Sequence, residues 1–204
     1  MLGLIRMLVA VEMLALPAWA AAVMVRPGGS RQDGLDPRPV LARLFRAPAP
    51  VVLLAAVLIG LAAFAEGPAV GEVLRTQAVA LGFLLLLSGL AVGLDRLAGP
   101  VAAQVLAMLL GWVIVGGIIL VGPAADLAQG PLQSALIRFA VHANPLVVAE
   151  RELGLDWLHQ TLTYRLTPLG ESFGYLVRDL SCWKTALGHV FVGSGLLVFG
   201  ARRP

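Results

Sequence analysis

Long apolar runs, nearly free of charge, restrict this 204-residue chain to one class of fold. A helix needs about 20 apolar residues to cross the ~30 Å hydrocarbon core of a bilayer. Five runs approach or reach that length, the last of them being the shortest: residues 2–25, 49–65, 76–94, 101–122 and 185–200. The sequence therefore predicts an all-α, polytopic membrane helix bundle with about five transmembrane helices. We expect residues 1–204 to form a single integral membrane domain.

Composition supports this class and argues against soluble alternatives. Hydrophobic residues make up 59% of the chain, charged residues 13%, and the mean hydropathy is +0.88. A soluble domain of this length is far more polar. The net charge of +3 is explained by membrane orientation and anionic lipid, so it does not predict binding to nucleic acid. The single Cys182 excludes an intrachain disulfide.

The first run has a second interpretation as a secretory signal. Small residues follow its apolar core at Ala18-Trp19-Ala20-Ala21-Ala22, as at a cleavage site. Against this, Arg6 is the only charge in the first six residues, and the apolar run continues through Met24 and Val25 into a basic loop. We therefore expect a retained transmembrane helix.

The distribution of arginine predicts the orientation, because Lys and Arg near the ends of spans remain on the cytoplasmic side. Basic residues are concentrated in loop 26–48, at Arg96 and after the last run. With five spans, these three places lie on one side of the membrane. We expect the N-terminus outside, the C-terminus in the cytoplasm, and a bacterial inner membrane as the location. Asp95 and Arg96 are expected to form an ion pair in a tight cytoplasmic turn.

The sequence predicts a short amphipathic helix in the cytoplasmic loop 26–48. Asp36-Pro37 is typical of a helix start, and apolar and basic side chains then alternate at helical spacing. This helix either lies on the inner lipid surface or docks a cytoplasmic partner such as a nucleotide-binding subunit. The residues expected to bind the partner are Arg38, Leu41, Arg43, Phe45 and Arg46.

The segment 123–184 is the longest polar part of the chain, and we expect it to lie on the outer side. Apolar residues recur at helical spacing from Leu132 to Ala140, and Asn144-Pro145 interrupts this helix because the residue before proline leaves the α region. A second helix is expected from about Leu146 to Tyr164. Two short helices, on the surface or re-entrant, fit this pattern. Their notable polar and interfacial residues are His142, Asn144, Pro145, Trp157 and Trp183.

Two polar side chains within the apolar runs stand out, because an uncompensated carboxylate in lipid is costly. Two interpretations of Glu12 are open. It belongs to a proton or substrate path, or it lies near the outer interface and contacts Arg6 or a neighbouring subunit. Gln104 is expected to form a hydrogen bond between helices. Small residues such as Gly89 and Gly93, and Gly193 and Gly195, predict close contacts between helices.

Catalytic and cofactor motifs are not apparent in the sequence. The three histidines are 17 and 30 residues apart and lack the spacing of a zinc site. Neither a Gly-x-Ser-x-Gly motif nor a phosphate-binding glycine loop is present. We predict no catalytic residue, cofactor or metal, although an enzyme acting on lipid through Glu12 and outer histidines is a third alternative.

The order of these elements resembles the last five helices of six-helix ATP-binding-cassette export permeases. The resemblance rests on the basic loop with its amphipathic helix, the tight turn, the outer helices beginning near Ala143-Asn144-Pro145-Leu146, and the ending Ala201-Arg202-Arg203. It implies that Asp36 to Arg46 is a coupling helix for a separate ATPase and that the outer helices are re-entrant. The family's first spanning helix and preceding interface helix have no counterpart here, so a partner chain would supply them.

Two functions follow as expectations. The chain is a non-enzymatic, permease-like component of such an exporter, with the lipid bilayer, other membrane subunits and a cytoplasmic ATPase subunit as partners. Alternatively, it is an accessory transmembrane subunit of a larger respiratory, photosynthetic or secretory complex, in which the outer helices hold a partner.

Overall fold

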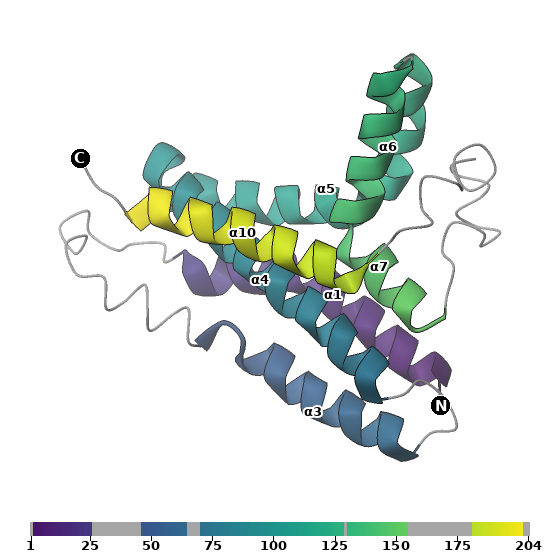
Figure 1. Cartoon of the computed structure of the whole chain (residues 1–204). Helices are drawn as coiled ribbons and strands as arrows, with labels where there is room; N and C mark the ends of the chain where they lie inside the picture. The colour runs from purple at the N-terminus through teal and green to yellow at the C-terminus, as the bar shows by residue number, and fades with distance from the viewer. Residues whose placement is uncertain (1, 26–45, 65–69, 129, 155–180, 202–204) are drawn as a thin grey trace.

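The chain folds into helices only, over the residues that the structure describes. This structure is a computed structural model that describes residues 2–25, 46–64, 70–128, 130–154 and 181–201. These residues contain no strand and form seven helices (Figure 1): α1 (Leu2–Met24), α3 (Ala49–Phe64), α4 (Val70–Ala98), α5 (Pro100–Leu127), α6 (Pro131–Ala143), α7 (Pro145–Glu152) and α10 (Cys182–Ala201). The prediction of an all-α fold is confirmed.

Four of these helices are long and apolar enough to cross a membrane, which indicates a membrane-embedded protein. The stretches concerned are Gly3–Met24, Val70–Ala98, Pro100–Gly122 and Cys182–Gly200. The fifth predicted span corresponds to α3, an apolar helix of 16 residues. At about 1.5 Å per residue, α3 is roughly 24 Å long, somewhat less than the hydrocarbon core.

The helices alternate in direction along the chain. The side chain of Arg6 in α1 reaches Leu153, and Arg75 in α4 and Cys182 in α10 both reach Glu152. Helices α1, α4 and α10 therefore all begin at the end of the bundle where α7 lies. Helices α3 and α5 run the opposite way, and the two chain termini lie at opposite ends (Figure 1).

The connection between α4 and α5 is a tight turn, as predicted, but it is shorter than expected. Helix α4 continues through Asp95 and Arg96 to Ala98, and Gly99 then turns with a φ of 81° before Pro100 begins α5. Asp95 and Arg96 therefore belong to the helix, and the predicted ion pair is wrong. The guanidinium of Arg96 instead donates to the carbonyl of Phe199 and lies 4.6 Å from that ring, which joins α4 to α10.

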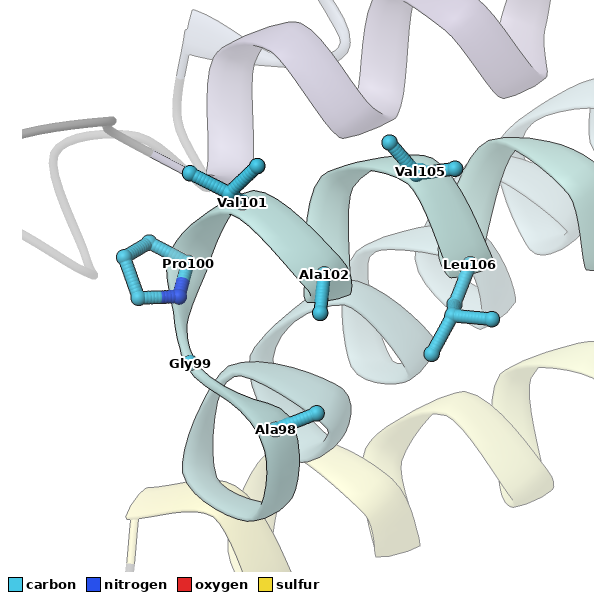
Figure 2. A pocket seen from close by; sticks show the side chains of 7 residues that line it. All are labelled: Ala98, Gly99, Pro100, Val101, Ala102, Val105 and Leu106. Carbon is cyan, nitrogen blue, oxygen red and sulfur yellow. The ribbon is translucent and has the colours of Figure 1, made fainter.

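A shallow apolar hollow lies beside this turn (Figure 2). Its volume is about 630 Å³, and it is lined by Ala98, Gly99, Pro100, Val101, Ala102, Val105 and Leu106. The lining offers no polar side chain that would orient a ligand. An apolar depression of this kind on a membrane helix suits contact with lipid acyl chains.

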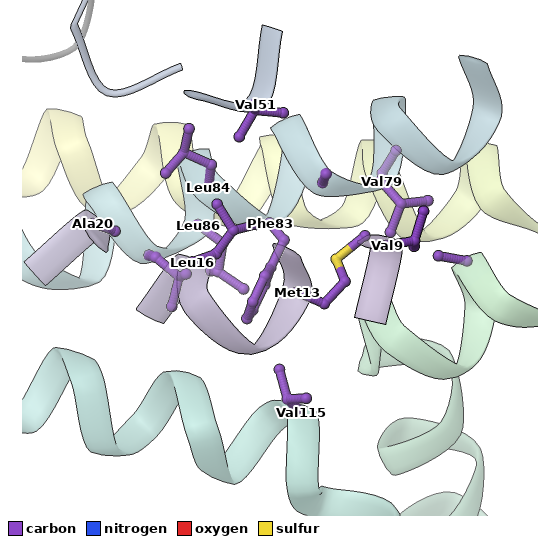
Figure 3. Packing of buried hydrophobic residues seen from close by; sticks show 14 of the residues in the cluster. Val9, Met13, Leu16, Ala20, Val51, Val79, Phe83, Leu84, Leu86 and Val115 are labelled. Atoms are coloured by element: carbon purple, nitrogen blue, oxygen red, sulfur yellow. The ribbon is translucent and has the colours of Figure 1, made fainter. Parts of the chain in front are cut away.

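The main core fills the space between α1, α3, α4 and α5 (Figure 3). Phe83 of α4 is fully buried at its centre, with Met13 and Leu16 of α1 beside it and Val115 of α5 on the other side. Val51 adds a contribution from α3. The buried faces of these four helices, together with side chains of α7 such as Val148 and of α10 such as Ala186, thus form one continuous apolar cluster.

Glycine allows α4 and α10 to approach each other closely. A methyl group at Gly89 would overlap the carbonyl of Gly193, and a methyl at Gly193 would lie 2.6 Å from the carbonyl oxygen of Leu85. The predicted contact through small residues is therefore confirmed at Gly89 and Gly193. A methyl at Gly195 would meet nothing within 4 Å, so that glycine does not serve this contact.

Helix α5 contributes to two separate apolar clusters, and its final part leaves the bundle. Ala103, Ala107 and Val115 pack in the main core. Beyond Gly116-Gly117, the side chains of α5 pack against α6 and Val147 of α7 instead. This second cluster consists of Ile118, Val121, Ala125, Ile137, Val141 and Val147. Figure 1 shows α6 and the end of α5 projecting together from the bundle as an arm. The arm comprises residues 118–127 and 131–143.

Several predicted boundaries differ from the observed ones. Helix α5 extends to Leu127 rather than ending at 122, α4 begins at Val70 rather than 76, and α10 begins at Cys182 rather than 185. The helix expected from 146 to 164 ends at Glu152, because Gly154 adopts a left-handed φ of 78°. Residues 155–164 lie outside the described part of the chain.

Candidate functional site

Polar side chains are concentrated where α7 meets the bundle. They fall into three groups: a junction between α6 and α7, a set of contacts that holds the end of α7, and a buried carboxyl–amide pair between α1 and α4. Each group joins residues that are far apart in sequence.

Asn144 is the centre of the junction between α6 and α7. Its side chain is completely buried, and its Oδ1 accepts hydrogen bonds from the backbone nitrogens of Leu146 and Val147 at 3.0 and 3.2 Å. Asn144 therefore caps the N-terminus of α7, with Pro145 in the first helical position. Its Nδ2 also donates to the carbonyl of Val115 at 2.7 Å, which ties the junction to α5 just before Gly116-Gly117.

Two side chains of α10 complete this junction by binding the last carbonyls of α6. The Thr185 hydroxyl donates to the carbonyl of His142 at 2.9 Å, and His189 Nε2 donates to the carbonyl of Ala143 at 3.0 Å. Because a carbonyl only accepts, the ring of His189 carries its proton on Nε2. These bonds satisfy groups that a helix end would otherwise leave unpaired. The ring of His189 also lies 5.5 Å from that of Phe83.

The end of α7 is held by three other helices. Arg6 of α1 donates two hydrogen bonds to the carbonyl of Leu153, from Nε at 3.1 Å and from Nη2 at 2.6 Å. Arg75 of α4 forms a salt bridge with Glu152, and Cys182 Sγ of α10 lies 3.3 Å from the same carboxylate. A positive charge at a helix C-terminus also interacts favourably with the helix dipole. We call these five residues the α7 clamp.

Glu150 is buried within this region without a hydrogen-bonding partner for its side chain. Its exposed fraction is 1%, and neither carboxyl oxygen has a partner among the described residues. Burial raises the pKa of Glu150 to about 7, and the positive charge of Arg6 opposes that rise. A carboxyl with this pKa exchanges its proton near neutral pH.

Glu12 and Gln77 form the third group, between α1 and α4. Both are buried, and Gln77 Nε2 donates to Glu12 Oε2 at 2.9 Å. The other oxygen of each side chain, Glu12 Oε1 and Gln77 Oε1, has no partner among the described residues. The contact between Glu12 and Arg6 that an interfacial position would allow is not formed, because Arg6 binds the carbonyl of Leu153. Glu12 lies inside the helix bundle and is bound by Gln77.

Most residues of the predicted coupling helix lie outside the described residues. This applies to Arg38, Leu41, Arg43 and Phe45, and also to Trp157 of the outer segment. Arg46 is described and exposed, just before the start of α3. The docking hypothesis for this helix stays a prediction.

The remaining predicted residues occupy different surroundings. Asn144 and Pro145 are buried at the junction, and the carbonyl of His142 contributes to it. Trp183 is 57% exposed in the first turn of α10, as expected of a side chain facing lipid or the interface. Gln104 is half-buried on α5, and its side chain forms no hydrogen bond with the described residues, so the expected bond between helices is not seen there.

Several polar residues that the fold brings together are not predicted from the sequence, namely Gln77, Glu150, Thr185, Arg75 and Cys182. Gln77 had a usable signal, because Val73, Ala80 and Leu84 follow the same face of α4 at helical spacing and are buried. Thr185 and His189 are four residues apart and therefore share a face of α10. Glu150 had no comparable signal, since its burial results from the way in which α7 enters the bundle.

The described residues contain no group of three or more His, Cys, Asp or Glu side chains placed to hold a metal ion. No family model, no curated protein and no solved structure matches this chain.

Proposed function

We propose that this chain is a non-enzymatic, permease-like membrane subunit of an ATP-binding-cassette-type exporter, working with a separate cytoplasmic ATPase subunit. The observation that carries this proposal is the placement of α6 and α7. The two short helices lie between α5 and α10 in the chain, and α7 is inserted against α1, α4 and α10 rather than lying over the bundle. The export permeases that the sequence resembles are expected to have such a helix pair before their last span.

The chemistry of the junction supports a re-entrant position. A break between helices is tolerated at membrane depth only where its backbone groups find partners inside the protein. Asn144, Thr185 and His189 provide such partners for both sides of the break. A break with capped helix ends, buried at one end of the bundle, is the kind of element that forms binding and gating sites in transporters.

The arrangement of the helices supports the proposed placement of the two termini on opposite sides of the membrane. An odd number of crossings is required to place the N-terminus outside and the C-terminus in the cytoplasm. The alternation of α1, α3, α4, α5 and α10 leaves the two termini at opposite ends, as five crossings require. In this proposal α3 crosses the bilayer with local adjustment of the lipid, and the protein resides in a bacterial inner membrane.

The second candidate function is that of an accessory subunit in a larger respiratory, photosynthetic or secretory complex. The observation that favours it is the apolar filling of the bundle. Phe83, Met13 and Leu16 occupy the centre between α1, α4 and α5, where a substrate path through a single subunit would need polar lining. In the exporter, a path would instead run along the surface shared with a partner chain.

Co-purification from mild detergent distinguishes the two candidates. A bound ATPase subunit supports the exporter, whereas redox or structural subunits support the accessory role. Recovery of a lone monomer contradicts both.

A double substitution, Arg43→Glu with Phe45→Asp, tests the coupling helix directly. In an exporter it abolishes ATPase binding while the membrane subunit still accumulates in the membrane. The matched control is Lys184→Glu, which reverses an exposed charge at the other end of the bundle. ATPase binding that is equally strong in both variants would rule out coupling through residues 36–46.

A further inference from the structure

We propose that Glu12 and Gln77 form a proton-binding site inside the helix bundle, in which a protonated Glu12 is joined to the Gln77 amide by two hydrogen bonds. The site does not depend on the identity of any partner subunit. It goes beyond the transport role, because it assigns a ligand, the proton, to a place between α1 and α4.

The hydrogen-bonding pattern is half of a cyclic acid–amide pair. One bond is present, from Gln77 Nε2 to Glu12 Oε2 at 2.9 Å. The second bond of such a pair would join the remaining two oxygens, which are the two atoms left without a partner, Glu12 Oε1 and Gln77 Oε1. Both oxygens only accept hydrogen bonds as long as Glu12 is ionised. A proton on Glu12 Oε1 converts one acceptor into a donor and pairs both atoms.

The ionised alternative leaves a negative charge without compensation. Glu12 is 6% exposed and Gln77 is 3% exposed, on the faces where α1 packs against α4. A carboxylate in hydrocarbon surroundings is costly unless a positive charge or several donors offset it. The Gln77 amide supplies a single hydrogen bond.

Charged side chains on the helices packed around Glu12 do not replace the proton. Helix α1 packs against α3, α4, α5 and α7, and it carries Arg6 itself. The charged residues on those helices are Glu72, Arg75, Asp95, Arg96, Asp126, Glu150, Arg151 and Glu152. Arg6 is bound to Leu153, Arg75 to Glu152, and Arg96 to Phe199. The partner that the structure gives to the Glu12 carboxyl is the uncharged amide of Gln77.

The bound proton would hold α1 to α4. With the proton, the two helices share two hydrogen bonds and no net charge at this contact. Without it, they share one hydrogen bond and a buried charge, which favours separation of the helices or entry of water. Proton release is thereby linked to the packing of α1.

Infrared spectroscopy of the purified chain in phosphatidylcholine vesicles at neutral pH tests this site. We expect a carbonyl stretching band of a protonated, hydrogen-bonded carboxyl group that disappears in Glu12→Gln. The band should persist in Glu72→Gln and Glu150→Gln, which serve as matched controls for two other carboxyl groups. Loss of an ionised carboxylate band in Glu12→Gln, with no loss of a carboxylic acid band, would overturn the proposal.

Gln77→Leu tests the hydrogen bonds of Glu12 through the frequency of its carboxylic acid band, which a purely structural role of Gln77 would leave unchanged. It removes the amide and retains Glu12, so the carboxylic acid band should shift to the higher frequency of an unbonded acid. If Gln77→Leu leaves the band unchanged, the acid–amide pair is wrong. If either variant fails to fold, Glu150→Gln protein carrying isotope-labelled glutamate decides between the protonated and ionised states of Glu12, because Glu150 itself is partly protonated at neutral pH.

Sodium is the remaining ligand that two acceptor oxygens would attract, and its effect is measured separately. The midpoint of thermal unfolding, Tm, should be the same in sodium chloride and in choline chloride of equal ionic strength. A rise in Tm specific to sodium, seen in wild type and lost in Glu12→Gln, would identify sodium rather than the proton as the ligand. That result would overturn the assignment.

Discussion

Glu150 holds a carboxyl group whose oxygens find no partner among the described residues, and its burial makes folding stability depend on pH. In the unfolded chain the carboxyl has its ordinary pKa of 4.5, whereas burial raises the pKa to about 7 in the folded protein. Between these values the folded state binds the proton more fully than the unfolded state does. Folding stability from this residue is therefore present below about pH 4.5 and falls as the pH rises toward 7.

Glu150→Gln should remove this dependence, because glutamine keeps the shape and carries no charge. Above pH 7 the variant should be more stable than wild type by on the order of 3 kcal/mol, while the two should be similar near pH 4.5. Thermal unfolding in detergent, followed by circular dichroism across this range, measures the difference. In Ser134→Ala, a control that removes no titratable group, the difference from wild type should stay constant. Parallel curves for wild type and Glu150→Gln would contradict the role of Glu150.

Asn144→Ala should destabilise the junction more than loss of an ordinary helix cap. The substitution removes two bonds to the start of α7 and leaves the buried carbonyl of Val115 without its side-chain donor. We expect a loss of about 2 to 4 kcal/mol, seen as a lower Tm. Ser134→Ala, on the same arm, should change Tm little. Asn144→Ser keeps a capping oxygen and loses the donor to Val115 without adding a charge, so its Tm should lie between those of wild type and Asn144→Ala.

At the residue scale, local rules predicted Asn144-Pro145 well and the buried acids poorly. The conformational effect of proline acts on its immediate neighbour, so the break is visible in the sequence. The burial of Glu150 and Gln77 depends on helices that are distant along the chain. Glu12 was identified because a carboxylate in an apolar run is rare, but its partner Gln77 lies 65 positions away.

Among the elements, the contact between α4 and α10 leads to a prediction about glycine. Gly89→Ala and Gly193→Ala should each destabilise the protein by about 1 to 3 kcal/mol, because the added methyl meets backbone of the facing helix. Gly195→Ala and Gly188→Ala are matched controls on α10, where a methyl meets nothing within 4 Å. These controls should leave stability unchanged or raise it by up to about 1 kcal/mol, since alanine favours helix. Equal Tm values for all four variants would show that the close approach is not required.

Helix positions were predicted well from hydropathy, and helix ends less well. A run of apolar residues identifies the membrane-crossing part, but polar residues such as Glu72 and Arg75 continue α4 beyond it. The end of α5 continues past 122 because Val121 and Ala125 find a separate partner in α6. The helix predicted to reach 164 ends at Glu152, because Gly154 adopts a positive φ. The hydrophobic pattern alone does not reveal this.

For the whole molecule, the proposed orientation predicts which sites a membrane-impermeant thiol reagent reaches. In a Cys182→Ser background, cysteines at Gly29 and Ala98 should react only after the membrane is opened, and a cysteine at Gly170 should react in intact cells. The native Cys182 is buried, and serine keeps a donor toward Glu152. Labelling of the cysteines at positions 29 and 170 from the same side of the membrane would contradict five crossings.

The arm of α5 and α6 has a mechanical consequence for the molecule. Its apolar cluster is distinct from the main core, and Val147 of α7 joins the two, because the neighbouring Val148 and Ala149 pack in the main core. Asn144 directly follows the last residue of the arm and fixes it to the bundle, because its side chain bonds to Val115 of α5, in the main core, and to the start of α7. A force on the arm, from a lipid surface or a partner, therefore reaches α10 through the hydrogen bonds that Thr185 and His189 donate to the last two carbonyls of α6.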